Sequence, residues 1–267
     1  MPKVSIIILN YRTSGLTIAC ANSLISLERQ SEREIIVIDN GSGDGSAQKI
    51  IKELGGKAKI VISKRNLGFS GGNNLGASQA SGDIFLFLNS DTIINQDIFS
   101  PCLSALEKDP KLGALSPWLL GATGQAQEFA YGNFPRLLSL VRRKTINKRV
   151  KPNKDGLIYT DWISGCALFI NRSTFETIGG WDENFFLYYE DVDLCQRLTQ
   201  AGFHNAVQRK ASLIHLGGRS LTYNKTRKKE YYRSQDYYFR KHHGKCLASI
   251  VSLARWPYLI YVKLVKS

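Results

Sequence analysis

The chain has 267 residues, of which 43% are hydrophobic and 22% are charged. This balance is typical of a folded globular protein and excludes a disordered or fibrous chain. The apolar run at residues 4–9 is shorter than the hydrophobic region of a signal peptide, and no stretch approaches the roughly 18–20 uninterrupted apolar residues of a membrane span. The five cysteines are scattered and include no Cys-x-x-Cys pair, so we expect buried, reduced thiols and a cytoplasmic location.

The formal net charge of +14 is concentrated in two segments. Residues 136–154 contain eight Lys or Arg and no acid, and residues 219–245 contain nine Lys or Arg against two acids. Two basic segments on an otherwise nearly neutral chain indicate an anionic partner. The candidates are a pyrophosphate, an acidic lipid surface and a nucleic acid, and charge alone does not choose between them.

Strand-like and helix-like stretches alternate through the first part of the chain. Apolar runs predict strands at 4–9, 35–38, 60–62 and 84–88, and helical spacing predicts helices at 16–27, 47–54 and 73–80. This alternation predicts an α/β fold with a Rossmann-like, mainly parallel sheet flanked by helices. Ligands are expected at the carboxyl ends of the strands.

The alternation of strand-like and helix-like stretches weakens from about residue 118, and regular patterns return from about residue 166. A strand is predicted at 166–170, and helices are predicted at 191–201, 230–243 and 247–264. We therefore expect a catalytic domain over 1–220, with a nucleotide-binding half to about 117 and an acceptor half over 118–220. A basic helical extension follows over 221–267. Its last helix suits an anionic membrane surface, and packing on the catalytic domain or on a second copy in a homodimer suits it equally well.

Polar residues end the first two predicted strands. Tyr11 follows the first strand and Asp39 ends the second, so an aromatic ring and a carboxylate would lie side by side for a nucleoside. The alternative for Asp39 is a turn or helix cap.

The segment 65–74 joins a strand to a helix and contains Arg65, Asn66 and several glycines. A cation and helix N-terminal amides suit phosphate or sugar contacts, whereas a flexible loop before a capped helix is the alternative. The segment has neither the Rossmann nor the Walker pattern.

Asn89, Ser90 and Asp91 end the strand at 84–88. Side chains two residues apart on an extended backbone face the same way, so Asn89 and Asp91 can address one cation, with Mg²⁺ or Mn²⁺ favoured by oxygen ligands. A helix cap is the alternative. His215 follows a short apolar run and is either a further metal ligand or a structural histidine.

Glu190 and Asp191 open the helix predicted at 191–201, and a third acid follows at 193. Carboxylates crowded beside apolar residues raise at least one pKa, which suits a general base for a hydroxyl nucleophile. The alternative is favourable placement of acids in the first turn of a helix.

Together these motifs resemble the inverting family-2 glycosyltransferases of the GT-A fold, and in particular rhamnosyltransferase-like members that build bacterial surface polysaccharides. The resemblance covers roughly residues 3–220. It is carried, in the family's order, by residues 4–11, 36–44, 65–76, 89–92, 162–170, 179–194 and 215–220.

The resemblance implies a role for each matching residue. Asp191 would be the catalytic base, and Asp91 with His215 would bind the divalent metal. Asn89 departs from the family, because it replaces the first aspartate of the DxD motif and lowers the charge at the metal. The nucleotide would be bound by Tyr11, Asp39, Arg65, Asn66, Gly71 and Ser90. Sugar and acceptor would be bound by Asn74, Trp162, Ser164, Gly165 and Glu190.

The resemblance also implies a nucleotide-sugar donor, with dTDP-L-rhamnose as the first expectation, and a growing lipid-linked glycan as acceptor. Three other classes compete with this interpretation. A nucleic-acid-binding protein would leave the acids at 190–193 unexplained, and no nucleic-acid motif is present, so no nucleic acid is expected. A nucleotidyltransferase would need a basic glycine-rich loop after the first strand. A non-catalytic glycan-binding subunit would not need Asp91, Asp191 and His215 together.

Overall fold

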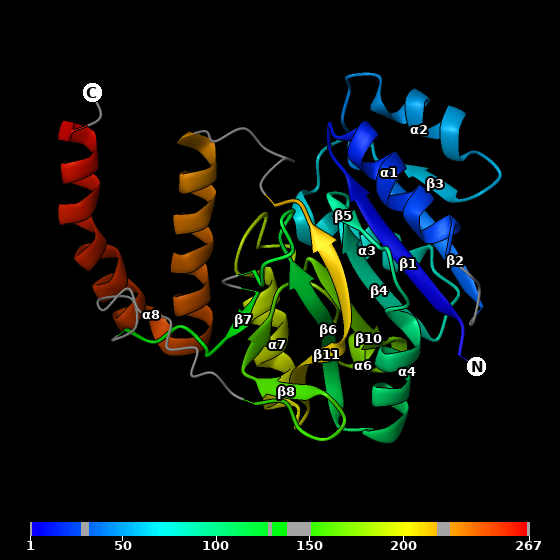
Figure 1. Cartoon of the computed structure of the whole chain (residues 1–267). Helices are drawn as coiled ribbons and strands as arrows, with labels where there is room; N and C mark the ends of the chain where they lie inside the picture. The colour runs from blue at the N-terminus through cyan, green and yellow to red at the C-terminus, as the bar shows by residue number, and fades with distance from the viewer. Residues whose placement is uncertain (1, 28–31, 128–129, 138–150, 218–224, 266–267) are drawn as a thin grey trace.

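The computed structural model describes residues 2–27, 32–127, 130–137, 151–217 and 225–265. Within these residues a nine-stranded sheet runs through the centre of the molecule, with helices on both faces and a long C-terminal helix at one side (Figure 1). The α/β fold class predicted from the sequence is confirmed.

The sheet has the strand order β3-β2-β1-β4-β10-β6-β11-β5, with β8 also paired to β11. The strands are β1 (Val4–Asn10), β2 (Arg33–Asp39), β3 (Lys59–Ile62), β4 (Ile84–Asn89), β5 (Thr92–Ile93), β6 (Leu112–Leu120), β8 (Leu157–Thr160), β10 (Ala167–Asn171) and β11 (His204–His215). A separate pair joins β7 (Tyr131–Gly132) to β9 (Trp162–Ile163). The four strands β3, β2, β1 and β4 are parallel, as expected, but β10 runs antiparallel between β4 and β6. The second half of the sheet is therefore mixed.

Alternating residues of β1 explain its continuous apolar run. Ile6 and Ile8 face one core and Ile7 faces another, so both faces of the strand are buried. The first core is covered by α1 (Ser14–Ile25), α2 (Ser46–Leu54) and α4 (Phe99–Lys108). The second is covered by α3 (Gly68–Ser78), α6 (Arg172–Thr177) and α7 (Glu190–Gln200).

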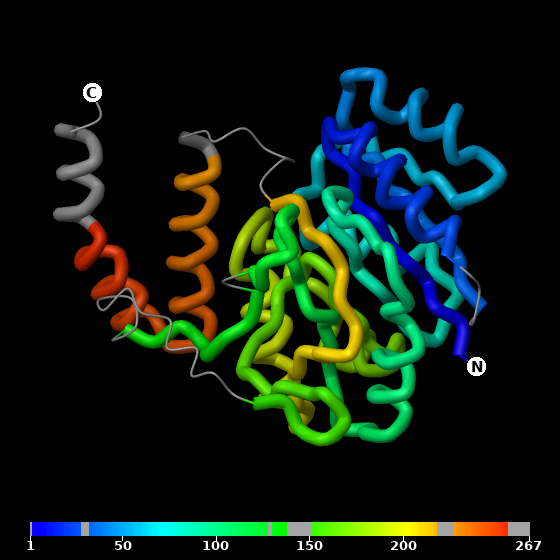
Figure 2. The backbone as a smooth tube through the Cα atoms, viewed as in Figure 1, coloured from blue at the N-terminus to red at the C-terminus, as the bar shows by residue number. Residues whose placement is uncertain are grey.

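The C-terminal helix α8 (Lys225–Val265) has two arms that meet at Gly244, whose φ of 86° breaks the helix. Figure 2 shows the arms running antiparallel beside the sheet domain. The guanidinium of Arg255 on the second arm pairs with Asp236 on the first. The two helices predicted at 230–243 and 247–264 are confirmed, and the first begins earlier than expected. No helix in the described part of the chain is long and apolar enough to cross a membrane.

The first arm of α8 packs against the sheet domain through an aromatic cluster. Tyr238 and Phe239 of α8 are fully buried, and they pack with Phe185, Tyr189 and Val192 from α7 and the segment before it. The rings of Tyr189 and Tyr238 lie 5.3 Å apart. This cluster fixes α8 against the N-terminal end of α7.

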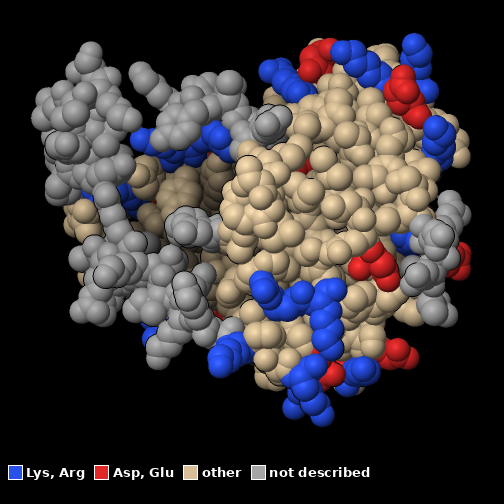
Figure 3. Space-filling view, viewed as in Figure 1, with Lys and Arg blue, Asp and Glu red and all other residues tan. Residues whose placement is uncertain are grey.

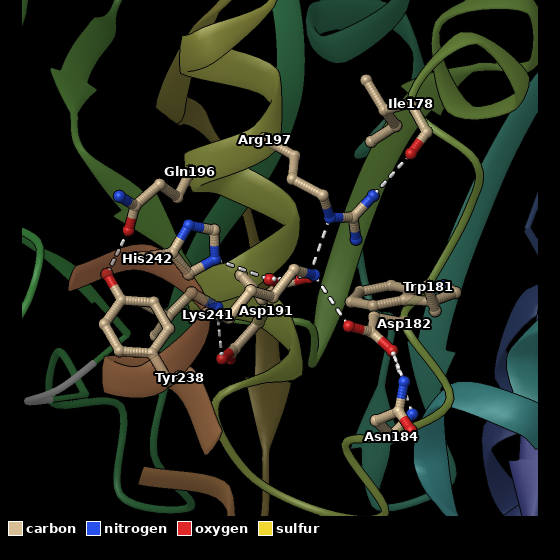
Figure 4. Close-up of polar contacts among 12 residues, drawn as sticks. Ile178, Trp181, Asp182, Asn184, Asp191, Gln196, Arg197, Tyr238, Lys241 and His242 are labelled. Atoms are coloured by element: carbon tan, nitrogen blue, oxygen red, sulfur yellow. Dashed lines mark hydrogen bonds and ion pairs between the residues drawn. The ribbon is translucent and has the colours of Figure 1, made fainter. Parts of the chain in front are cut away.

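A buried carboxylate adds polar contacts to this interface. Asp193 of α7 is fully buried and accepts hydrogen bonds from Arg197 Nε at 2.8 Å and His242 Nε2 at 2.7 Å. Lys241 Nζ lies 2.7 Å from the same carboxylate and also 2.7 Å from Asp182. Figure 4 shows Lys241 and His242 reaching from α8 toward Arg197 on α7.

The pKa values of the two acids follow from these contacts. Burial alone would raise the pKa of Asp193, but the His242 hydrogen bond and the charges of Arg197 and Lys241 hold it below its ordinary value of 3.8. Burial likewise opposes the shift of Asp182, and hydrogen bonds from Lys241 and Asn184 lower its pKa to about 2. Both acids therefore favour folding above pH 3.8. This contribution is lost as the pH falls below 3.8, and for Asp182 it is lost as the pH falls toward 2.

We expect Asp193→Ala to destabilise the fold by about 3 kcal/mol, because it leaves partly buried Arg197 and Lys241 without their shared carboxylate. Urea unfolding at pH 7, followed by circular dichroism, measures this loss. Glu176→Ala is the control, since the Arg172–Glu176 pair is exposed and its loss should cost less than about 1 kcal/mol. Equal losses for the two variants would contradict this account of the α7–α8 interface.

Candidate active site

Seven of the predicted site residues line one cleft of about 220 Å³. The cleft lies where β4 and β11 end and α7 begins. The seven residues are Asn89, Asp91, Ser164, Gly165, Glu190, Asp191 and His215. Its other lining residues are Phe69, Cys166, Leu187, Tyr188 and Arg227.

Asp191 is oriented by two backbone amides. Gly165 N donates to its Oδ2 at 3.1 Å, and Val192 N donates to its Oδ1 at 2.8 Å. An added Cβ at Gly165 would lie 3.2 Å from the ring of Phe69, which is a tight contact. Burial raises the pKa of Asp191 above 3.8, while the two amide hydrogen bonds limit the rise. The result is a carboxylate of fixed orientation and increased basicity.

Glu190, the preceding residue, lies in an environment that disfavours the charged form of its carboxyl group more strongly. The residue is 6% exposed, and its Oε2 has no hydrogen-bond partner among the described residues. Burial, followed by the charge of Asp191, raises the pKa of Glu190 well above 4.5. The expectation that crowding raises at least one pKa in this cluster is confirmed. Because amides of Gly165 and Val192 bond to both carboxylate oxygens of Asp191, whereas Glu190 Oε2 has no partner among the described residues, Asp191 is the better candidate for the ionised base.

Asp91 and His215 face each other across the cleft. Asp91 is buried, and its Oδ1 lies 3.2 Å from His215 Nε2 without a satisfied hydrogen bond. Gln127 donates from Nε2 to the His215 carbonyl at 2.8 Å, which directs its Oε1 to His215 Nδ1 at 2.8 Å. Nδ1 must then carry the proton, so a neutral imidazole points the lone pair of Nε2 at the Asp91 carboxylate.

Two lone pairs facing each other repel unless a cation lies between them. A proton on His215 Nε2 or a divalent ion held jointly with Asp91 would remove this repulsion. The described residues contain no cluster of three His, Cys, Asp or Glu, so this site offers two such ligands, with the Asn89 amide lining the same cleft. The donor set fits an ion that keeps several water or substrate ligands, such as Mg²⁺ or Mn²⁺.

The residues predicted to hold the nucleoside do not line this cleft. Asn10 and Asp39 are register partners on β1 and β2, so the prediction that these strand ends lie side by side is confirmed. The Asp39 carboxylate is buried and accepts hydrogen bonds from Asn10 Nδ2 at 2.7 Å and from the Ser42 hydroxyl. Tyr11 follows Asn10 at the end of β1, and Ser90 is buried with its hydroxyl 3.2 Å from that of Thr13.

The glycine-rich segment is the first half of a helix and not a loop. Helix α3 begins at Gly68, five residues before the predicted start. A Cβ at Gly72 would lie 2.4 Å from Leu9 Cδ1, and one at Gly76 would lie 2.3 Å from Ile7 Cγ2. These glycines therefore allow α3 to pack directly on β1. Gly71 is likewise buried within α3 and does not line the cleft.

The remaining predicted residues do not line the cleft. Asn66 Oδ1 accepts hydrogen bonds from Gly68 N and Asn40 Nδ2. Arg65, the residue before it, has an exposed side chain.

The predicted sugar-binding residues Asn74 and Trp162 contact other parts of the backbone. Asn74 Nδ2 donates to the carbonyl of Trp181, and Asn74 Oδ1 accepts from Trp181 N. Trp162 donates from Nε1 to the carbonyl of Asn133 at 3.1 Å.

Two of the five lining residues that were not predicted from the sequence contact each other. Tyr188 precedes α7 in a left-handed conformation, with φ of 70°, and Arg227 belongs to α8. Arg227 Nε donates to the Tyr188 hydroxyl at 3.0 Å. The basic segment at 219–245 predicted an anionic partner, but its sequence does not show which of its cations reaches the cleft. Most of the basic segment at 136–154 lies outside the described residues.

Comparison with known proteins identifies relatives across most of the chain. The N-acetylglucosaminyl-diphospho-decaprenol L-rhamnosyltransferase of Mycobacterium tuberculosis is 27% identical over 222 residues, which cover 72% of this chain and 70% of the relative. The low-salt glycan biosynthesis hexosyltransferase Agl10 of Haloferax volcanii is 27% identical over 223 residues, covering 80% of this chain and 67% of the relative.

Solved structures share the fold at lower sequence identity. GalNAc-T7 with UDP, GalNAc and Mn²⁺ is 16% identical, with a TM-score of 0.65, covering 90% of this chain and 50% of that one. The mannosyltransferase PcManGT of Pyrobaculum calidifontis, with GDP-Man and Mn²⁺, is 15% identical, with a TM-score of 0.63, covering 90% and 64%. The model for glycosyl transferase family 2 matches residues 5–178, and we conclude that this chain belongs to that family.

Proposed function

We propose that the chain is an inverting glycosyltransferase that moves a sugar from a nucleotide-sugar donor to a hydroxyl group of a glycan acceptor, with Asp191 as the general base. The observation that carries this proposal is the fixed orientation of the Asp191 carboxylate by Gly165 N and Val192 N. This carboxylate lines the same cleft as Asp91 and His215. A base, together with a pair of residues that could hold a divalent cation at the same cleft, suits a displacement that releases a diphosphate.

In the proposed reaction, Asp191 accepts the proton of the acceptor hydroxyl while the hydroxyl oxygen attacks the anomeric carbon. The bond from that carbon to the diphosphate breaks on the opposite face, and its electron pair leaves with the nucleoside diphosphate. A single displacement of this kind inverts the anomeric configuration. Glu190, which favours the protonated form, would donate a hydrogen bond to the acceptor or the sugar.

Asp91 and His215 would hold a divalent metal, with Asn89 as a neutral oxygen ligand. Such an ion would stabilise the charge that develops on the departing diphosphate. The Mn²⁺ in the solved structures of GalNAc-T7 and PcManGT supports this assignment. Tyr11, Asp39 and Asn66 would contact the nucleotide at the adjoining strand ends.

For the donor we propose dTDP-L-rhamnose, and for the acceptor a lipid-linked glycan. The mycobacterial relative is named as an L-rhamnosyltransferase of a diphospho-decaprenol-linked sugar, which supports both choices. The Haloferax relative is named as a hexosyltransferase, so UDP-linked hexoses are the competing donors.

Replacing Asp191 by asparagine keeps the shape of the side chain but removes the proton acceptor. We expect kcat to fall by roughly 10²–10⁴-fold, with a change in melting temperature of only a few degrees. Initial-rate measurements with a saturating donor give kcat, and thermal unfolding reports the fold. Glu107→Gln, an exposed acid on α4, is the control and should turn over normally.

The pH dependence gives the same assignment a second test. Asp191 is active when ionised, and its pKa is raised above 3.8, so wild-type kcat should rise with pH along an acid limb that lies above pH 3.8. The residual turnover of Asp191→Asn should lack that limb. Near-normal turnover, or an unchanged acid limb in the variant, would show that another group is the base.

The donor and the metal can be identified in one screen. We expect dTDP-rhamnose with Mg²⁺ or Mn²⁺ to raise the melting temperature and to release dTDP slowly, and EDTA to abolish both effects. UDP-glucose, UDP-N-acetylglucosamine and GDP-mannose complete the panel. Stabilisation by one of these instead would correct the sugar, whereas no response to any donor would favour a non-catalytic glycan-binding subunit.

We also propose that the second arm of α8 contacts an anionic membrane surface. Ile250 and Leu253, three residues apart on one helix face, are 49% and 70% exposed, and Lys245 is exposed nearby. Cosedimentation with phosphatidylglycerol vesicles should be weakened by Ile250→Asp. Ile51→Asp, which places the same charge at a 47% exposed isoleucine of α2, should not weaken it. Equal binding of the two variants to the vesicles would contradict the proposal that α8 contacts a membrane surface.

A further inference from the structure

Arg227 brings a positive charge from the C-terminal helix into the cleft of the sheet domain. It lines the cleft together with Asp91, Asp191 and His215. Among the described lining residues it is the only arginine or lysine, whereas three carboxylates line the same space. Figure 3 shows Lys and Arg side chains gathered at the hollow between the C-terminal helical part and the sheet domain.

The position of the Arg227 guanidinium is fixed by Tyr188. Arg227 Nε donates to the Tyr188 hydroxyl at 3.0 Å, and the Tyr188 ring packs edge-on against Tyr231 of α8 at 5.7 Å. Tyr188 and Tyr189 have φ values of 70° and 66°, a backbone conformation that bulky residues rarely adopt. Gln235 of α8 holds the next ring through its hydrogen bond to the Tyr189 hydroxyl at 2.7 Å.

This strained turn has a geometric consequence. It places Tyr188 at the cleft, two residues before Glu190, and so brings the α8 arginine to the same space as Asp191. Backbone strain of this kind costs roughly 1–3 kcal/mol per residue and persists where the surrounding contacts enforce it. Here the enforcing contacts come from α8.

The electrostatics of the cleft define what Arg227 can bind. A nucleoside diphosphate carries two or more negative charges, and the carboxylates of Asp91 and Asp191 would repel it. A divalent ion at Asp91 and His215 would offset the two charges of the nucleotide-sugar diphosphate but would leave the charges of Asp91 and Asp191 without compensation. A guanidinium matches phosphate oxygens with paired donors, which an ammonium cannot do.

We propose that the Arg227 guanidinium binds the diphosphate of the nucleotide-sugar and that Tyr188 is the positioning residue that orients this guanidinium. This inference rests on the proposed function and adds a residue of α8 to its binding site. Helix α8 then acts on the reaction directly, because it supplies a charge at the leaving group.

The test measures nucleotide affinity by titration calorimetry with Mg²⁺. Wild type and Arg227→Gln are titrated with dTDP, UDP and GDP and with the corresponding monophosphates. We expect Arg227→Gln to weaken diphosphate binding by about tenfold or more. The ratio of the diphosphate affinity to the monophosphate affinity should therefore fall in this variant. Arg227→Lys should recover part of the affinity, and Tyr188→Phe should lose part of it.

Arg233→Gln is the matched control, because Arg233 lies on the same arm of α8 with its side chain 68% exposed. It should bind all nucleotides as the wild type does. A merely structural role for Arg227 would weaken mono- and diphosphates equally, so an unchanged preference in Arg227→Gln overturns the proposal even if the variant is less stable. Wild type that binds none of the nucleotides would instead overturn the proposed function itself.

Discussion

The buried carboxylate of Asp193 is the interaction on which the arrangement of this molecule depends. It joins α7, which opens with Glu190 and Asp191, to the first arm of α8 through Lys241 and His242. Successive helical residues point about 100° apart, so Asp191 and Asp193 face nearly opposite directions. One acid therefore lies at the cleft, while the other anchors the helix that carries it. This anchoring brings α8 close enough for its side chains to reach the cleft.

The cleft shows how one short acidic motif divides into distinct roles. Amide donors hold both carboxylate oxygens of Asp191 in place. Glu190 has an Oε2 without a partner among the described residues and favours its proton, and Asp193 is surrounded by cations that keep it ionised. All three acids stand within four residues of sequence, so the difference arises from what each side chain meets. Burial raises the first two pKa values, and cationic partners lower the third. A general base beside a proton donor requires this separation of environments.

The glycines of α3 have a structural function that the local pattern does not show. From the sequence, their segment was expected to suit phosphate or sugar contacts at a helix N-terminus. Here Gly72 and Gly76 serve close packing on Leu9 and Ile7, a function that depends on a strand distant in sequence. Arg227 is one of the nine basic residues at 219–245. The sequence did not identify it, because no local pattern distinguishes a cation that lines a cleft from one that is exposed to solvent.

The sequence alone determined the α/β class, most strand and helix positions, and the residues at strand ends, because these follow from local periodicity and from chain breaks at polar residues. It also predicted Asp91, Asp191 and His215, which the fold brings to one cleft. Only the tertiary structure decided the antiparallel insertion of β10, the partner of each acid at the start of α7, and the approach of Arg227 to Tyr188. These features depend on contacts between segments far apart in sequence, and such contacts leave no periodic signal in the chain.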